Sequence, residues 1–227
     1  MSIAFLLRVR PRERGEVPVA QTVLADLRDG WRAVRERAWL WSILVCFSAA
    51  VLLSFAPWFT LGPTVTEHVY GSTGVFGILV AAAGAGTILG AMTGFRWRPL
   101  HPMRTGMLLA LPWPLASLGV ALALPLGLVV PAFVLSGFGI ALFGIWWETA
   151  LAERVPPHLL SRVSAYDWMV SLSLLPIGYL LAGPLGEALG EQAVLAVGAA
   201  AAALALAAAL LVRETRTLRR LERAAAA

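Results

Sequence analysis

The sequence predicts an all-α membrane protein built as a bundle of six transmembrane helices. Of its 227 residues, 59% are hydrophobic and only 14% are charged, and the mean hydropathy is +0.78. A soluble domain carries about 25% charged residues, so composition alone indicates a membrane protein. Apolar stretches of about 20 residues, the length that crosses the hydrocarbon core, recur along the chain.

Six such stretches can be separated, and each is expected to form one helix. They are Trp39–Thr60, Val75–Phe95, Thr105–Leu124, Leu126–Trp147, Val163–Leu185 and Ala193–Val212. Only Pro125 separates the third stretch from the fourth, so a re-entrant pair is an open alternative there. The predicted domains are a basic cytoplasmic segment over 1–38, the bundle over 39–212, and a basic cytoplasmic tail over 213–227.

The placement of the basic residues predicts the orientation. All 18 are arginine. With six crossings, both termini share one side, and that side receives eight arginines before the first span, three after the second, two after the fourth and five in the tail. The positive-inside rule then places both termini in the cytoplasm, as expected for a multi-pass protein of a bacterial-type inner (plasma) membrane.

The segment before the first span combines arginines with apolar residues at helical spacing, among them Leu24, Leu27, Trp31 and Val34. This pattern favours an amphipathic helix on the membrane surface. A solvated basic linker is the alternative.

Several classes of function are excluded because the chain lacks lysine, has one cysteine and has no pair of histidines at metal-binding spacing. Without lysine there is neither a Walker-type phosphate loop nor Schiff-base chemistry. The single cysteine, Cys46, allows no disulfide framework, and His68, His101 and His158 form no metal-binding pair. No basic patch is interleaved with aromatic residues, so nucleic acid is not an expected partner. We therefore predict no enzyme activity, no catalytic residue, no cofactor and no metal.

The turn between the fourth and fifth spans concentrates charge in an apolar chain, with Glu148, Arg154, Arg162 and Asp167 near it. Two interpretations are open. These residues are interfacial ion pairs worth about 1 kcal/mol each, or they form a cytoplasmic gate whose pairs break and reform.

Four aromatic residues accompany this turn: Trp146, Trp147, Tyr166 and Trp168. They are candidates to contact a small-molecule substrate or to line a cytoplasmic entrance. Anchoring in an aromatic belt at the membrane interface is the alternative.

Glycine and proline mark two of the spans. Gly86, Gly90 and Gly94 recur every four residues, a spacing that lets membrane helices approach closely. In the fifth span, helix-breaking residues predict a kinked helix that moves, although such helices also occur in static bundles. These residues are Pro176, Gly178, Gly183 and Pro184.

Three segments carry a resemblance to a known family. They read DLRDGWRAVRERAWLW (26–41), ERVPPHLLSRVSAYDW (153–168) and LPIGYLLAGPLG (175–186). With their order along the chain, they resemble the carboxy-terminal half of a major facilitator superfamily transporter, in the branch of enterobactin exporters and macrolide efflux proteins. The second segment is the most specific. The loop after the second span, GAMTGFRWRPLHPMR, lacks the aspartate of the family's gating motif.

The resemblance implies a fold of twelve helices in two halves with substrate in a cleft between them. The six spans would be helices seven to twelve, with the first, second, fourth and fifth facing the cleft, and Met1–Leu7 would end helix six. It implies a proton-coupled efflux antiporter for small amphipathic molecules such as drugs, macrolides or siderophores. A complementary six-helix half, or a second copy, would be needed besides membrane lipid, and the proton-coupling carboxylate would lie in that other half. A non-transporting membrane scaffold or partner subunit is the alternative.

Overall fold

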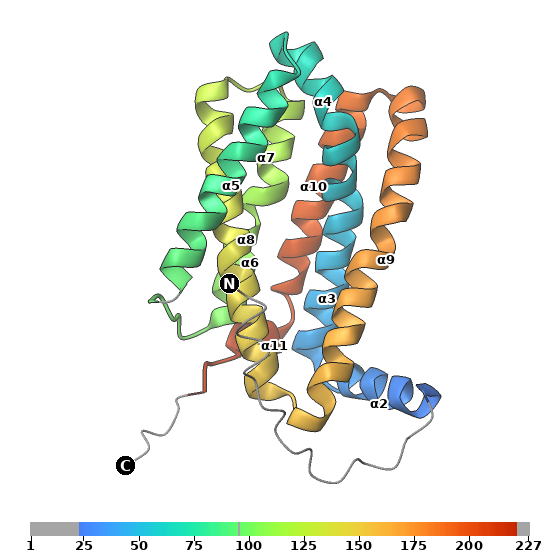
Figure 1. Cartoon of the computed structure of the whole chain (residues 1–227), viewed down its shortest axis with the longest axis vertical. Coiled ribbons are helices and arrows are strands. Elements are labelled where there is room, and N and C mark those ends of the chain that lie inside the picture. The colour runs from blue at the N-terminus through green and yellow to red at the C-terminus, as the bar shows by residue number, and fades with distance from the viewer. Residues whose placement is uncertain (1–22, 95, 222–227) are drawn as a thin grey trace, which may run out of the picture.

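The computed structural model describes residues 23–94 and 96–221, and these residues are helical without strands. Figure 1 shows an upright bundle with the short helix α2 (Val23–Arg35) lying across one end. Five helices in the described chain are long and apolar enough to cross a membrane. They are Ala38–Tyr70, Gly74–Gly94, Leu126–Arg154, Pro157–Leu189 and Glu191–Ala209.

The first span is one continuous helix that runs ten residues beyond the predicted Thr60. It consists of α3 (Ala38–Ala50), the π-helical turn η1 (Val51–Phe55) and α4 (Ala56–Tyr70). The N–H of Ala56 donates to the carbonyl oxygen of Val51, five residues earlier, which is the π-helical pattern. Pro57 has no N–H to donate, so the regular ladder is interrupted beside this turn in any case.

The helices α5 (Gly74–Gly94) and α8 (Leu126–Arg154) form the most extensive helix pair of the bundle. Glycines on both helices permit their close approach. A Cβ atom at Gly86 would lie 1.9 Å from the carbonyl oxygen of Val134, and one at Gly137 would lie 1.9 Å from that of Ala83. The backbones therefore touch where no side chain separates them.

The predicted third span is not a single helix. It is divided into α6 (Pro102–Ala110) and α7 (Pro112–Ala121), with Leu111 between them. Pro112 and Pro114 have no N–H, so consecutive helical hydrogen bonds are lost at this point. The prediction of one helix over 105–124 is wrong in this respect, and neither half alone has the length of a membrane span.

The prolines of the fifth span do not end its helix, and the predicted kink and motion there stay predictions. The helix α9 (Pro157–Leu189) continues through Pro176 and Pro184, both of which are exposed. Their rings therefore point away from neighbouring helices, and a helix is retained because irregular backbone facing lipid would leave more polar groups unsatisfied. The chain ends in α10 (Glu191–Ala209) and the short α11 (Arg213–Thr217).

The arginines of the described residues gather at one end of the bundle. This end carries α2, the starts of α3, α6 and α9, the ends of α5, α8 and α10, and α11 (Figure 1). The predicted helical segment before the first span is occupied by α2, in which Ala33 and Val34 are buried while Trp31 and Arg32 are exposed. Met1–Leu7 and the first four arginines lie outside the described residues.

Candidate functional site

A side-chain hydrogen bond joins α8 to α9 near the charged turn. The indole N–H of Trp147 donates to Oδ2 of Asp167 at 2.9 Å. The Trp147 ring is buried, with its edge toward Trp39 of α3 at 5.7 Å between centroids and its face toward Phe143. Asp167 is thus held by a donor whose ring is fixed in the core.

Of the other charged residues near the turn, Glu148 lies close to Asp167, whereas Arg154 is directed elsewhere. Glu148 is exposed, and the Asp167 carboxylate is near enough for its negative charge to act on it. Arg154 instead donates from its guanidinium to the carbonyl oxygen of Arg219 in the C-terminal tail. Two negative charges, those of Glu148 in α8 and Asp167 in α9, therefore lie near each other on either side of the turn. Arg154 is directed to the C-terminal tail.

The start of α9 packs against α2. A Cβ atom at Gly30 would lie 2.8 Å from the Tyr166 ring and 3.3 Å from Cβ of Arg162, so only glycine fits there without displacement. The rings of Trp31 and Tyr166 lie 6.1 Å apart between centroids. Arg162 and Tyr166 thus face the basic helix before the first span.

The four candidate aromatic residues do not line one entrance. Trp147 faces Asp167, and Tyr166 faces α2, as described above. Trp146 is buried and donates its indole N–H to the carbonyl oxygen of Trp97 at 3.3 Å, whereas Trp168 is 60% exposed. Neighbouring helical residues point about 100° apart, so residues adjacent in sequence reach different surroundings.

The hinge and helix-contact candidates fall into two groups. Gly90 and Gly94 continue the contact of Gly86 with α8, because a Cβ atom at Gly90 would lie 2.5 Å from the carbonyl oxygen of Phe138 and one at Gly94 would lie 2.6 Å from Cδ1 of Ile145. In α9, a Cβ atom at Gly178 would lie 2.5 Å from Cβ of Ala56, beside the π-helical turn. The other candidate glycine of α9 has no such neighbour: a Cβ atom at Gly183 would meet nothing within 4 Å.

The C-terminal tail is bound to the start of the first span. The backbone N–H of Trp39, in the first turn of α3, donates to the Glu214 carboxylate at 3.2 Å. The hydroxyl groups of Ser42 and Thr215 are also 3.2 Å apart, and both residues are buried. A carboxylate at a helix N-terminus satisfies an N–H that has no helical partner and interacts favourably with the helix dipole.

The same tail also reaches the loop after α5 and the end of α8. The N–H of Arg220 donates to the carbonyl oxygen of Leu100 at 3.1 Å, and the N–H of Leu221 donates to Oε2 of Glu153 at 3.4 Å. Sequence reasoning missed these contacts because their partners lie far apart along the chain.

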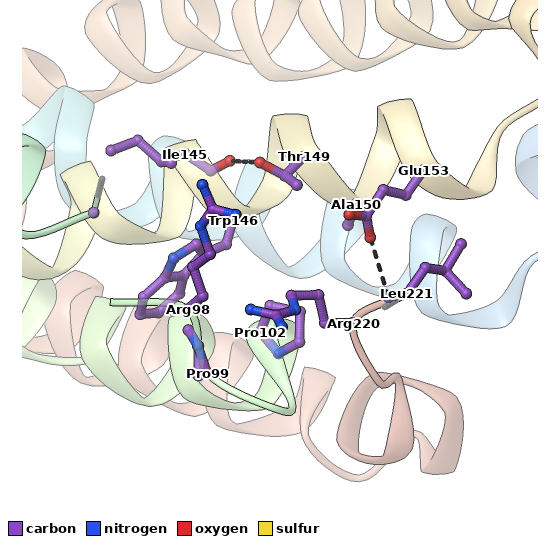
Figure 2. Close-up of a pocket in the computed structure, with 11 residues that line it drawn as sticks. Arg98, Pro99, Pro102, Ile145, Trp146, Thr149, Ala150, Glu153, Arg220 and Leu221 are labelled. Carbon is purple, nitrogen blue, oxygen red and sulfur yellow. Dashed lines mark hydrogen bonds between the residues drawn. The ribbon is translucent and has the colours of Figure 1, made fainter. Parts of the chain in front are cut away.

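These tail contacts form one wall of a cavity of about 660 Å³ (Figure 2). The loop after α5 contributes Arg98 and Pro99, α8 contributes residues from Ile145 to Glu153, and the tail contributes Arg220 and Leu221. Trp146 is part of the hydrophobic core and also lines this cavity.

No group of three or more histidine, cysteine, aspartate or glutamate side chains that could hold a metal ion occurs within residues 23–94 and 96–221. In the same part of the chain, the buried polar residues are serines and threonines. Asp167 of α9 thus accepts a hydrogen bond from Trp147 and experiences charge repulsion from Glu148, both on α8.

Comparison with known families identifies the family of the chain. A sequence model of the Major Facilitator Superfamily matches residues 1–173 of the 227. The chain belongs to the Major Facilitator Superfamily. This superfamily is a family of transporters and not of enzymes. The five long apolar helices found in the described part of the chain are consistent with a multi-pass membrane fold. No curated protein and no solved structure matches the chain.

Proposed function

We propose that this facilitator protein is the carboxy-terminal half of a proton-coupled exporter of small amphipathic molecules of the drug, macrolide or siderophore kind. Family membership supports transport in general. In this proposal α6 and α7 together make one crossing, which gives six spans. The gathering of the described arginines at one end supports cytoplasmic termini in a bacterial-type inner membrane.

The hydrogen bond between Trp147 and Asp167 is the observation that carries this proposal. The two helices that it joins share little other contact, and α9 is the least buried of the five apolar helices. The other main contacts of α9 are with α2, the first span and α10. It can therefore move with these helices relative to α8, and the polar link at its cytoplasmic end can act as a gate. Glu148 beside Asp167 would favour opening, because like charges repel.

A place for bending lies further along the same helix. Gly178 of α9 meets the π-helical turn of the first span through Leu52 and Ala56. π-helical turns are frequent at functional sites because they replace regular hydrogen bonds with a wider, weaker pattern. We assign the hinge of α9 to this contact, between Pro176 and Gly183.

The proposal requires a second six-helix unit. Polar side chains stand exposed on otherwise apolar helices, among them Glu148 of α8 and Tyr179 of α9. Exposed polar groups are expensive against lipid, so these positions suit a cleft shared with a complementary half or a second copy. The proton-coupling carboxylate is assigned to that other unit.

Transport in reconstituted vesicles tests the proposal. A proton gradient is imposed on phospholipid vesicles that hold this chain alone or together with a complementary amino-terminal half, and efflux of a cationic amphipathic dye is followed. We expect flux only when two halves, or two copies, assemble. The variant Asp167→Asn should change the rate, whereas Trp168→Phe should not.

Two results would contradict the proposal. Absence of flux with any complementary half, in vesicles where assembly is demonstrated, favours the alternative of a non-transporting scaffold. Flux that persists unchanged without a proton gradient removes the proton coupling but leaves transport itself in place.

A further inference from the structure

The cavity of about 660 Å³ between the loop after α5, α8 and the tail has the chemistry of a binding site for an amphipathic anion. Figure 2 shows its polar lining, which comes from three segments distant in sequence. Arg98 belongs to the loop, Glu153 to α8 and Arg220 to the tail.

The charges in this cavity favour an anion. Two guanidinium groups stand against one carboxylate, and Oε2 of that carboxylate already accepts the N–H of Leu221. Within the described residues, neither Arg98 nor Arg220 makes an ion pair through its side chain. Arginine binds phosphate oxygens through paired, charge-assisted hydrogen bonds, so two arginines from different segments fit one phosphate.

The rest of the lining is apolar. Ile145, Trp146, Ala150 and Leu221 contribute hydrocarbon surface, and Thr149 donates its own hydroxyl hydrogen to the carbonyl oxygen of Ile145. A ligand that places a charged head between the arginines therefore meets hydrocarbon next to it. A site with two arginines next to apolar side chains favours an amphipathic phosphate over a small soluble anion, which has no hydrocarbon to place there.

The position of the cavity fits the same ligand class. It lies at the end of the bundle that carries the arginines, where α5 ends at Gly94 and α6 begins at Pro102. Since α5 is an apolar span, its end is expected at the level where the hydrocarbon gives way to phospholipid phosphates. Basic pockets between membrane helices on the cytoplasmic side bind anionic headgroups.

We propose that this cavity binds the phosphate of an anionic phospholipid, held between Arg98 and Arg220. The glycerol and the first acyl methylenes lie against Ile145 and Leu221. The N–H of Arg220 already donates to Leu100 in the same loop as Arg98. A phosphate bound by both arginines therefore fastens the tail to this loop. The inference is independent of transport, and it holds for a scaffold as well as for an exporter.

Thermal unfolding in lipid nanodiscs tests this inference. The whole chain is placed in phosphatidylcholine alone or in phosphatidylcholine mixed with phosphatidylglycerol, and lipid retained by the protein is measured by native mass spectrometry. We expect phosphatidylglycerol to raise the Tm and to remain bound. The double variant Arg98→Gln, Arg220→Gln should bind it about tenfold or more weakly.

Matched variants separate this cavity from general surface charge. Arg104→Gln, Arg216→Gln removes the same charge from exposed positions that do not line the cavity. We expect it to retain the lipid as the unmodified protein does. Thr149→Trp keeps both arginines and fills the cavity, and it should lose the lipid too, which covers the case in which the arginine double variant does not fold.

Two further outcomes are decisive. If glycerol phosphate in solution raises the Tm as much as phosphatidylglycerol does, the site takes a soluble phosphate and the lipid assignment is overturned. Equal loss of lipid in the two arginine double variants would show that surface charge alone attracts it and would overturn the site.

Discussion

The indole of Trp147 and the carboxylate of Asp167 lie 2.9 Å apart across two helices that otherwise share little contact. Trp147→Phe keeps an aromatic ring in the core and removes the donor. A polar group that loses its partner costs about 1–3 kcal/mol. We expect a loss of stability of that order, measured as reversible unfolding in detergent.

The matched changes for this pair are Trp168→Phe and Asp167→Asn. Trp168 is 60% exposed, so its replacement should leave stability within about 0.5 kcal/mol. Asparagine at position 167 retains an oxygen that accepts the indole N–H, and its loss should be smaller than that of Trp147→Phe. A Trp147→Phe protein as stable as the unmodified one would show that the hydrogen bond contributes little.

Glycine at position 86 is predicted to be required for the close packing of α5 against α8. A Cβ atom there would lie 1.9 Å from a backbone oxygen of α8, which cannot move as a flexible side chain can. Gly86→Ala should force α5 away from α8 and destabilise the protein by about 1–3 kcal/mol. Gly84→Ala, where nothing lies within 4 Å, should be neutral or slightly stabilising. Equal Tm values for the two alanine variants would refute the close contact.

Glu214 is predicted to cap the first span. Glu214→Ala removes the acceptor of the Trp39 N–H and should lower stability by about 0.5–1 kcal/mol. Faster hydrogen exchange of the Trp39 amide should accompany this loss. Glu187→Ala, an exposed glutamate at the far end of α9, is the control and should leave that amide unchanged.

The orientation is tested by labelling single cysteines. In a Cys46→Ser background, cysteine replaces His68 at the end of the first span or Arg216 in α11. A membrane-impermeant maleimide added to intact cells should label position 68 and leave position 216 unlabelled until the membrane is opened. The opposite pattern would invert the topology and remove the assignment of the termini to the cytoplasm.

The length of the apolar runs located the long apolar helices of the described chain well, because insertion into a bilayer depends mainly on composition over about 20 residues. It placed helix ends less well, since charged residues such as Glu67 and Glu153 do not end a helix that leaves the hydrocarbon. The effect of Pro112 was missed, because it divides a predicted span into α6 and α7. Pro176 lies within a continuous α9, as a proline in a kinked helix can, so the kink predicted there stays a prediction.

The candidate site was only partly accessible to sequence reasoning. The turn with Asp167 was singled out by its charge, but the donor to Asp167 is an indole that had been assigned to substrate or to the membrane interface. Arg154 was expected near an acid, and its guanidinium contacts the backbone of Arg219 instead. The π-helical turn was not predicted, although Pro57, which has no N–H to donate, lies just beyond it. The other features of this turn, its contacts with Gly178 and Gly198, involve residues far away in sequence.

Glu214 and Trp39 are 175 positions apart, which orders their appearance during biosynthesis. The opening turn of the first span enters the bilayer while its acceptor is still untranslated. Its amide must remain hydrated, or be shielded by an insertion factor, until Glu214 has been synthesised. An mRNA truncated before the Glu214 codon would yield a polypeptide that inserts but lacks the acceptor of the Trp39 N–H. The start of its first span would then be more accessible to cellular proteases.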